Sequence, residues 1–198
     1  RRGEALPPAQ EAVDIYRGLA ADNPGYLPDL AGALNNLGNR LAELGRRGEA
    51  LPAAQEAVDS YRGLAADNPG YLPDLAGGLT NLGIRLADLG RRGEALPPTQ
   101  EAVDIYRALA VDNHGYLPDL AGALTNLGIR LAELGRHADA LAPAEEAIQI
   151  YRGLARDNPG YVPELAGALT NLGLRLAGLG RHSDALAPAE EAVELYRG

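Results

Sequence analysis

The amino-acid sequence predicts an all-α protein, built as a superhelical solenoid of antiparallel helix pairs. The first observation is an internal repeat. A similar sequence segment begins again every 45 residues, at Arg1, Arg46, Arg91, Arg136 and Arg181. The second is that each copy holds two segments whose apolar residues recur at the spacings of an amphipathic helix. One helix pair cannot bury its apolar stripe alone, so neighbouring copies are expected to stack. Four full copies cover residues 1–180, and a partial fifth covers 181–198.

The later helix of each copy, here called helix A, is clearest in the second copy. It is expected to begin near Pro73-Asp74, because proline suits a first helical turn and aspartate places a negative charge at the positive end of the helix dipole. Gly90 is expected to end it. The apolar stripe between these points consists of Leu75, Leu79, Leu82, Leu86 and Leu89.

The other helix, here called helix B, is expected from about Glu49 to Asp67, with Ala, Leu, Val and Tyr side chains along one side. Asn68-Pro69-Gly70 then ends it, since proline cannot continue a helix and Asn and Gly accept turn geometry. Pro52 lies just beyond the first turn, so that turn is expected to be irregular or kinked. The sequence opens on a helix B, and nine helices are therefore expected: one helix B followed by four A–B pairs.

The composition excludes several classes of protein. A net charge of −9 disfavours nucleic acid as a partner, because neutralising phosphates requires a basic surface. No apolar run approaches the roughly 18 residues of a membrane helix, so no membrane partner is expected. The chain has no cysteine, which excludes disulfides and fits a cytoplasmic protein. We expect one repeat array over 1–198, taken from a longer protein because the first residue is Arg and the start falls in mid-pattern.

No catalytic or cofactor site is evident in the sequence. It lacks a phosphate-binding loop, a Ser-His-Asp arrangement and a pair of acids in an apolar setting. The histidines do not have the mutual spacing of metal ligands; they are His114, His137 and His182. We therefore expect neither an enzyme nor a bound cofactor or metal.

One polar residue recurs within helix A. Asparagine is a mediocre residue in a helix interior, yet an Asn-Leu-Gly recurs at Asn36, Asn81, Asn126 and Asn171. At 100° per residue, Asn81 shares a face with Gly77 and Ile84, away from the leucine stripe. The same face carries Ile129 in the third copy and Leu174 in the fourth, and Thr80, Thr125 and Thr170 flank it. An amide offers a donor and an acceptor together, which match the two polar groups of a peptide unit.

Two interpretations of this face remain open. The asparagines either hold a ligand, or they bond the neighbouring helix A and act as spacers between copies. The apolar strip of Ile84, Ile129 and Leu174 is equally compatible with ligand contact and with packing between helices. The first copy differs from the others, since Asn35 and Asn39 make its face more polar.

The order of large, small and glycine positions resembles the tetratricopeptide repeat. It is carried by Leu79, Asn81-Leu82-Gly83, Leu86, Gly90 and Ala95, and by the matching positions of the other copies. That family's repeat is about 34 residues, so the longer unit here, with Leu-Asn-Asn-Leu-Gly at 34–38, is most similar to the kinesin light chain variety. The chain departs from the family pattern in having no Trp or Phe.

The resemblance implies a concave groove, lined by the A helices, that binds a partner peptide or helix. The four asparagines resemble the Asn-Leu-Ala/Gly ladder of O-GlcNAc transferase repeats, which implies a hold on a peptide backbone. Asn39 resembles the Gly-Asn of the carboxylate-clamp repeats of heat-shock co-chaperones. The candidate groove residues are Asn36, Asn39, Thr80, Asn81, Ile84, Thr125, Asn126, Ile129, Thr170, Asn171 and Leu174.

These observations favour a protein-interaction scaffold with a protein or peptide partner. The alternative is a structural spacer array that stacks end to end on copies of itself, without a dedicated peptide ligand. Both ends of the sequence are B helices, so end-to-end association is expected from the faces that an A helix would otherwise cover.

Overall fold

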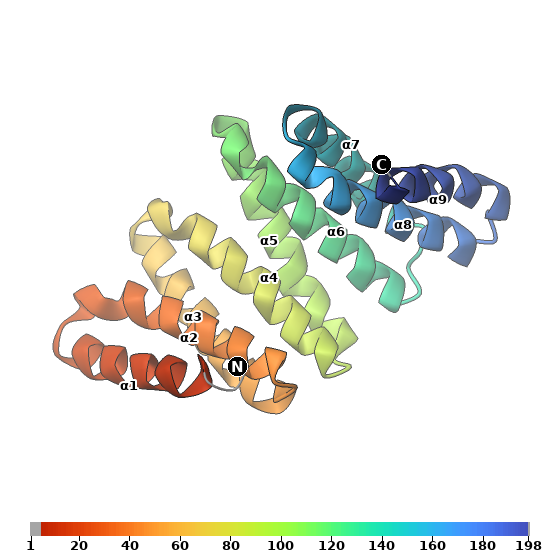
Figure 1. The fold of residues 1–198 in the computed structure, drawn as a ribbon. Helices are drawn as coiled ribbons and strands as arrows, with labels where there is room; N and C mark the ends of the chain where they lie inside the picture. The colour runs from red at the N-terminus through yellow and green to blue at the C-terminus, as the bar shows by residue number, and fades with distance from the viewer. Residues whose placement is uncertain (1–4, 198) are drawn as a thin grey trace. The chain divides into compact units, whose positions relative to one another are not determined.

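The computed structural model describes residues 5–197, and these residues form nine α-helices and no strand (Figure 1). The helices are α1 (Leu6–Asp22), α2 (Leu27–Glu43), α3 (Arg47–Asp67), α4 (Leu72–Asp88), α5 (Arg92–Asp112), α6 (Leu117–Glu133), α7 (Leu141–Asp157), α8 (Val162–Gly178) and α9 (His182–Arg197). Odd-numbered helices are B helices and even-numbered helices are A helices. The predicted all-α fold and the order of one helix B followed by four A–B pairs are confirmed.

A short 3₁₀ turn leads from each helix B into the next helix A. In the turn Pro69–Tyr71, the side-chain oxygen of Asn68 accepts a 2.9 Å hydrogen bond from the backbone N–H of Gly70. The helix α4 then starts at Leu72, with Pro73 and Asp74 in its first turn. The predicted start is therefore confirmed to within one residue.

A glycine in the left-handed region lies two residues beyond the end of each helix A, close to the predicted end. Gly90 has a φ of 74°, which costs a glycine nothing because it has no Cβ. Its N–H bonds the carbonyl of Ala87 at 2.8 Å, and the N–H of Arg91 bonds that of Leu86 at 2.9 Å. These two bonds satisfy the last carbonyls of α4 and turn the chain into α5.

The B helices differ from the prediction at their proline positions. The helix α3 runs from Arg47 through Pro52 without interruption, and α5 likewise contains Pro97 and Pro98. The hydrogen bond that Pro52 cannot make would have gone to Gly48, which is exposed, so water can satisfy that carbonyl. Among the copies whose helix B start lies within the described residues, the fourth is irregular there, because α7 begins at Leu141 after a turn.

The core follows the leucine stripe of helix A. Its deepest members, Leu34, Leu79, Leu124 and Leu169, are at most 2% exposed. In the second copy Leu75 and Leu79 pack with Val58 and Tyr61 of the preceding helix B. Burial of a leucine contributes roughly 1.5–3 kcal/mol, so this recurring contact carries much of the stability.

The glycines of the first two Asn-Leu-Gly motifs are explained by close packing onto the following helix B. A Cβ at Gly38 would lie 3.3 Å from the carbonyl oxygen of Ala50, and one at Gly83 would overlap the hydroxyl of Thr99. A larger residue would push the two helices apart. In the first two copies this glycine therefore allows the close approach of helix A and helix B, whereas a Cβ at Gly128 or Gly173 would meet its neighbours at ordinary contact distance.

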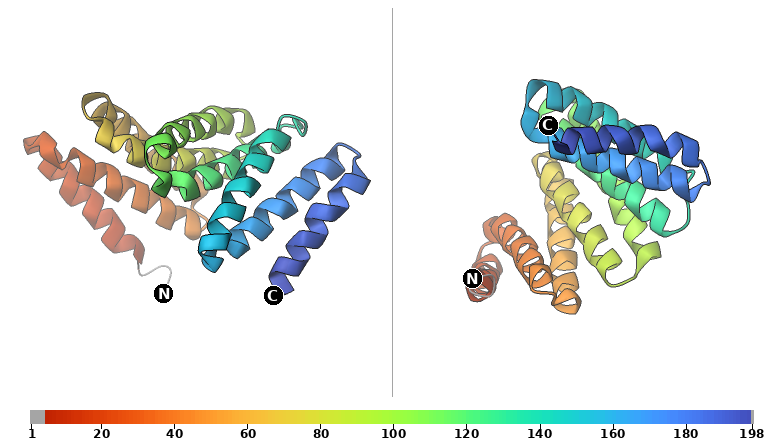
Figure 2. Two further views of the ribbon diagram at one scale, coloured as in Figure 1. Left: turned by 90° about the horizontal axis from the view of Figure 1, so that it is seen from above. Right: turned by 45° about the vertical axis from the view of Figure 1, so that its right-hand side comes forward.

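The chain divides into two compact units, residues 1–105 and 106–198, with the division inside α5. In the first unit α2 packs against α1 and α3, and α3 packs against α4. In the second unit α7 packs against α6 and α8, and α8 lies antiparallel beside α9, as the views of Figures 1 and 2 agree. Each unit therefore repeats the same A–B contact.

Candidate functional site

The predicted site residues occupy one side of the A helices, here called the helix-A face, and most of them are less exposed than the sequence suggests. Asn36 is exposed, whereas the side chains at the equivalent positions Asn81, Asn126 and Asn171 are half-buried, and so is Asn39. Half-burial arises because neighbouring A helices approach one another on this side: α2 contacts α4 in the first unit, and α6 contacts α8 in the second.

In the first unit, Asn81 is bonded across two A helices. Its Nδ2 on α4 donates a 2.9 Å hydrogen bond to Oδ1 of Asn35 on α2. The bond uses one donor of Asn81 and leaves the side-chain oxygen of Asn81 available. This contact is the one that the spacer interpretation expects, although its partner, Asn35, was not among the predicted site residues.

In the second unit, the equivalent amides are not bonded to one another. The side chains of Asn126 on α6 and Asn171 on α8 form no hydrogen bond within the described part of that unit. The residue that matches Asn35 there is Thr125, whose hydroxyl donates instead to the carbonyl of Ala121 at 2.9 Å. The amide bridge thus depends on Asn35, which only the first copy carries.

All three threonines of the face use their hydroxyl hydrogen in the same way. Thr80 and Thr170 donate to the carbonyls of Ala76 and Ala166, at 2.9 and 2.8 Å. A threonine hydroxyl bonded to its own helix retains lone pairs. The threonines can therefore accept a hydrogen bond from a ligand but have no donor to offer.

The apolar strip lies partly between helices. Ile84 and Ile129 are half-buried, whereas Leu174 is 58% exposed. Ile129 lines a cavity of about 10 Å³ together with Thr125 of α6 and Asn171 and Arg175 of α8. The structure thus brings three of the predicted site residues together, in a space no larger than one water molecule.

Sequence reasoning missed a buried arginine that follows the asparagine by one helical turn in each unit. Arg85 and Arg130 each follow the asparagine by four residues, and their side chains are only 13% and 11% exposed. They pair with Asp88 at 3.5 Å and Glu133 at 3.1 Å, while the Nε of each arginine is buried without a hydrogen-bond partner. Arg85 and Asp88 therefore form a partly buried ion pair rather than a fully solvated one. The fixed four-residue spacing in every copy was the available signal.

The fourth copy differs because Gly178 stands where the earlier copies have an acid. Arg175 consequently has no acid three residues later on its own helix. Burial lowers the pKa of Arg175, the charge of Glu133 opposes this by raising it, and Arg130 lowers it further. The helix-A face of the second unit thus holds two arginines and one acid in a partly buried setting.

The tyrosine on helix B reaches the helix-A side. The backbone of Gly32 lies beside the Tyr61 hydroxyl, which a Cβ would approach to 3.5 Å, and Gly122 lies beside that of Tyr151. Burial raises the pKa of Tyr61 to about 12, with further contributions from the charges of Asp74 and Asp29. Burial likewise raises the pKa of Tyr151. At 3.5 and 3.7 Å both glycine contacts lie in the ordinary van der Waals range, so a Cβ at either glycine would touch the hydroxyl without overlapping it.

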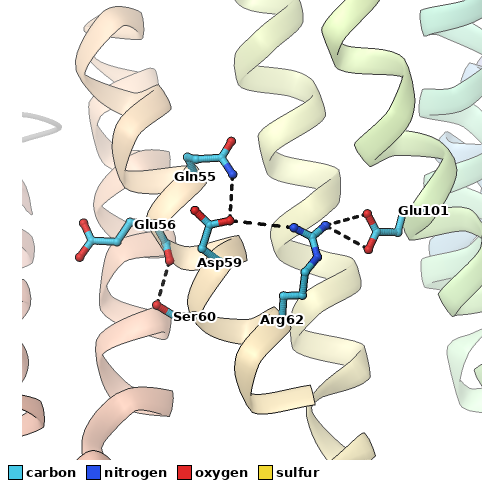
Figure 3. Close-up of polar contacts among 6 residues, drawn as sticks. All are labelled: Gln55, Glu56, Asp59, Ser60, Arg62 and Glu101. Carbon is cyan, nitrogen blue, oxygen red and sulfur yellow. Dashed lines mark hydrogen bonds and ion pairs between the residues drawn. The ribbon is translucent and has the colours of Figure 1, made fainter. Parts of the chain in front are cut away.

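The B helices carry a ladder of ion pairs, which the sequence reading also missed. Nη2 of Arg62 on α3 donates to both oxygens of Glu101 on α5, and the shorter bond is 2.8 Å (Figure 3). Nη1 of the same guanidinium lies 3.9 Å from Oδ1 of Asp59. Gln55 donates to Asp59 at 3.1 Å. The same pair, 39 residues apart, recurs as Arg17–Glu56, Arg107–Glu146 and Arg152–Glu191. Because each cation is matched by an acid, this surface is a weaker candidate for a charged ligand than the helix-A face.

Within residues 5–197, no group of three or more His, Cys, Asp or Glu side chains is arranged to hold a metal ion. No described helix is long and apolar enough to cross a membrane.

Comparisons with solved structures agree with this architecture. A putative kinesin light chain of Podosopora anserina, with nearly identical TPR-like repeats, aligns at a TM-score of 0.66 and 16% identity, over 95% of this chain and 87% of that one. BtubC from P. vanneervenii aligns at 0.58 and 17% identity, over 100% and 91%. The apo form of RapI aligns at 0.72 and 15% identity over 95% of this chain, which spans 49% of RapI. At such identities the likeness concerns the fold alone.

A comparison with curated protein sequences gave no match. The sequence does match a protein family, described as the tetratricopeptide repeat, over residues 30–68, 75–118, 120–159 and 165–197. Each matched segment starts within a helix A and extends through the following helix B. Because these segments cover well over half of the residues in step with the helix pairs, the chain belongs to the tetratricopeptide repeat family.

Proposed function

We propose that this chain is a non-catalytic protein-interaction scaffold that holds an extended or helical segment of a partner protein in the groove of its helix-A face. The repeat fold is consistent with a protein-interaction role. The observation that carries the proposal is the state of Asn126 and Asn171. Both amides are half-buried on successive A helices and have no hydrogen-bond partner within the described part of the second unit. A partly buried amide without a partner gains most from a ligand that supplies one.

The chemistry of the face suits a polypeptide backbone. Each amide supplies a donor and an acceptor, and the threonine hydroxyls supply acceptors for backbone N–H groups. Backbone groups are common to all peptides, so selectivity would come from the partner side chains that meet Ile129 and Leu174. We expect modest sequence preference rather than recognition of one strict motif. A cytoplasmic location also remains a prediction.

The test uses peptides selected from a random library displayed on phage against the full chain. The selected peptides, labelled with a fluorophore, are then titrated with the wild type and with the Asn126→Ala/Asn171→Ala variant, and anisotropy is measured. Loss of the amides should weaken binding about tenfold or more, since an unmatched hydrogen bond in a desolvated contact costs about 1–3 kcal/mol. Gln149→Ala, which removes an exposed amide from helix B, is the matched control and should not change affinity. Unchanged affinity in the double variant would contradict the proposal.

The first unit supports a second function, that of a structural spacer. Asn81 bonds Asn35 across two A helices, as a residue that fixes the spacing of repeats would. The spacer function expects association of the chain with itself end to end and no selected peptide that depends on the amides. Sedimentation at increasing concentration separates the two functions, because a scaffold remains monomeric where a stacking spacer grows.

A further inference from the structure

The first unit holds a pocket between two successive B helices, here called the α3–α5 pocket, with a volume of about 550 Å³. The helix α4 contributes Leu79, Leu82 and Leu86 to its lining, and the flanking helices contribute proline rings, Pro52 of α3 and Pro97 of α5. None of the residues of the helix-A face lines it, so it is a separate site. Its volume lies within the range of pockets that hold small ligands.

An equivalent pocket of about 450 Å³, here called the α1–α3 pocket, lies one copy earlier. Its leucines on α2 match those on α4, and its proline rings are Pro7 of α1 and Pro52 of α3. The repeat therefore builds this kind of pocket, rather than a local irregularity. Helices precede and follow α3, α4 and α5 in the sequence, so a further copy at either end would not cover the α3–α5 pocket.

Both arginines that line the α3–α5 pocket are already paired with an acid that also lines it. Arg62 of α3 reaches Glu101 of α5 and donates two hydrogen bonds, at 2.8 and 3.1 Å (Figure 3). Nε of Arg91 donates to Glu94 at 2.8 Å. A charged ligand would have to compete with one of these pairs, whereas a neutral ligand leaves both intact. The charges of the pocket therefore favour a neutral occupant.

Paired arginines beside apolar side chains suit an aromatic ring. A carboxylate occupies the N–H edge of a guanidinium and leaves its flat faces open for stacking. The face of an aromatic ring carries partial negative charge and is attracted to a guanidinium. The leucines and prolines provide apolar contact for the rest of the ring, and a proline loses no side-chain entropy on contact. An aliphatic side chain would use only the apolar part of this lining.

We propose that the α3–α5 pocket is a docking site for an aromatic side chain of a partner protein, carried on a segment that brings no charge into the pocket. The α1–α3 pocket has the same chemistry. A partner with two suitably spaced aromatic side chains would engage both pockets and bind more tightly than through either one. This site does not depend on the proposed peptide groove, because it lies outside the helix-A face.

The experiment uses the full chain and a neutral peptide, acetyl-Gly-Ser-Trp-Ser-Gly-amide. The chain has no tryptophan, so the tryptophan emission of the peptide is observed alone while the chain is titrated into it. The emission should shift to shorter wavelength and saturate, because the indole leaves water. A competitor peptide with phenylalanine in place of tryptophan should displace it. A competitor with leucine, which is apolar but has no ring to stack, should be about fivefold less effective.

Variants of the chain place the bound ring. Pro52→Glu/Pro97→Glu adds a charged side chain to both pockets and should weaken binding about tenfold or more. Glutamate is a better helix former than proline, so folding should persist, and circular dichroism checks this. Val111→Glu adds the same charge to α5 at a residue that is 76% exposed and lines neither pocket. This matched control should leave binding unchanged.

A second variant tests the stacking itself. Arg17 and Arg62 line the two pockets at matching positions of the repeat. Arg17→Gln/Arg62→Gln should weaken binding of the tryptophan peptide about fivefold and leave the potency of the leucine competitor unchanged. Equal weakening of both peptides would show that the arginines do not stack on the ring and would overturn the aromatic assignment.

Three further results would overturn the docking site: no saturable shift, equal displacement by the phenylalanine and leucine peptides, or unchanged binding by the Pro52→Glu/Pro97→Glu variant. The Asn126→Ala/Asn171→Ala variant should bind the tryptophan peptide as the wild type does. Loss of binding in that variant would assign the ring to the peptide groove instead. Failure of the docking site and failure of the proposed peptide groove are therefore distinguished by separate variants.

Discussion

The imidazole ring of His137 lies directly against Gly178, so that a Cβ at Gly178 would come within 2.9 Å of the ring Cε1 and Nδ1 atoms. His137 belongs to the turn before α7, and Gly178 is the last residue of α8. The Nδ1 atom is buried without a hydrogen-bond partner. Only the fourth copy combines a glycine and a histidine at these positions, so the contact fixes a local structure that the other copies do not share.

We expect Gly178→Ala to destabilise the chain by about 1–3 kcal/mol, because the added methyl overlaps the ring and forces it to move. In a His137→Ala background the same change should cost little or should stabilise, since alanine is the better helix former. Thermal melts of the four proteins in this double-mutant cycle measure the difference. Equal effects of Gly178→Ala in both backgrounds would show that the ring contact is not what limits this position.

Leu79→Ala should destabilise the chain by about 2–5 kcal/mol, because it leaves a cavity among fully packed neighbours. Leu79 is 1% exposed. The control is Leu174, a leucine on another helix A that is 58% exposed. Leu174→Ala should change the free energy of unfolding by less than about 0.5 kcal/mol. Urea unfolding followed by circular dichroism compares the two, and a mild effect at Leu79 would mean that the stripe is not the core.

Asn81→Ala should lower the free energy of unfolding by about 0.5–1.5 kcal/mol, because Asn35 is left without its hydrogen-bond partner in a half-buried position. The double change Asn35→Ala/Asn81→Ala should cost less than Asn81→Ala alone, since both partners are then removed and alanine favours the helix. Chemical denaturation of the two single variants and the double variant gives the coupling energy. Strict additivity would show that the bond contributes nothing to stability.

Glu101→Gln should cost at most about 1 kcal/mol, because the ion pair with Arg62 is solvent-exposed. The side chains of Arg62 and Glu101 are 49% and 42% exposed, so salt should screen the attraction. Melting the variant and the wild type at low and at high ionic strength checks this. A difference between the two proteins that persists at high salt would point to a packing role for Glu101 instead.

Alkaline pH should destabilise the chain through Tyr61. Its pKa is raised to about 12 in the folded chain, against about 10 for an unperturbed tyrosine. The unfolded chain therefore loses the phenol proton first, so this contribution is fully present below about pH 10 and is lost as the pH rises towards 12. Tyr61→Phe cannot titrate, and its melting temperature should fall less over that range. An ultraviolet titration in which all nine tyrosines ionise together would contradict the raised pKa.

The sequence was sufficient for features that lie within one copy. The proline and acid at the start of helix A, and the glycine at its end, act through backbone geometry and so placed the start of α4 to within one residue and its end to within two. Pro52 was misjudged because its effect depends on whether the carbonyl that it leaves unbonded, that of Gly48, can reach water.

Features between copies could not be predicted in this way. The bond from Asn81 to Asn35 and the burial of Arg85 both depend on how closely neighbouring A helices approach, which no single repeat encodes. The ion-pair ladder has a constant separation of 39 residues, but many other charged residues of the chain also recur at fixed separations. The ladder could be recognised only once the B helices were placed.

The regularity of that ladder has a consequence for how such a gene can change length. Removing residues 46–90 would bring Glu101 to the position of Glu56, where it could pair with Arg17. Inserting another copy would likewise add one complete Arg–Glu pair to the ladder. Unequal crossing-over between nearly identical copies adds or removes whole copies, so its products keep the 39-residue separation of each Arg–Glu pair. Evolution can therefore change the number of copies in discrete steps without disturbing the ion-pair ladder.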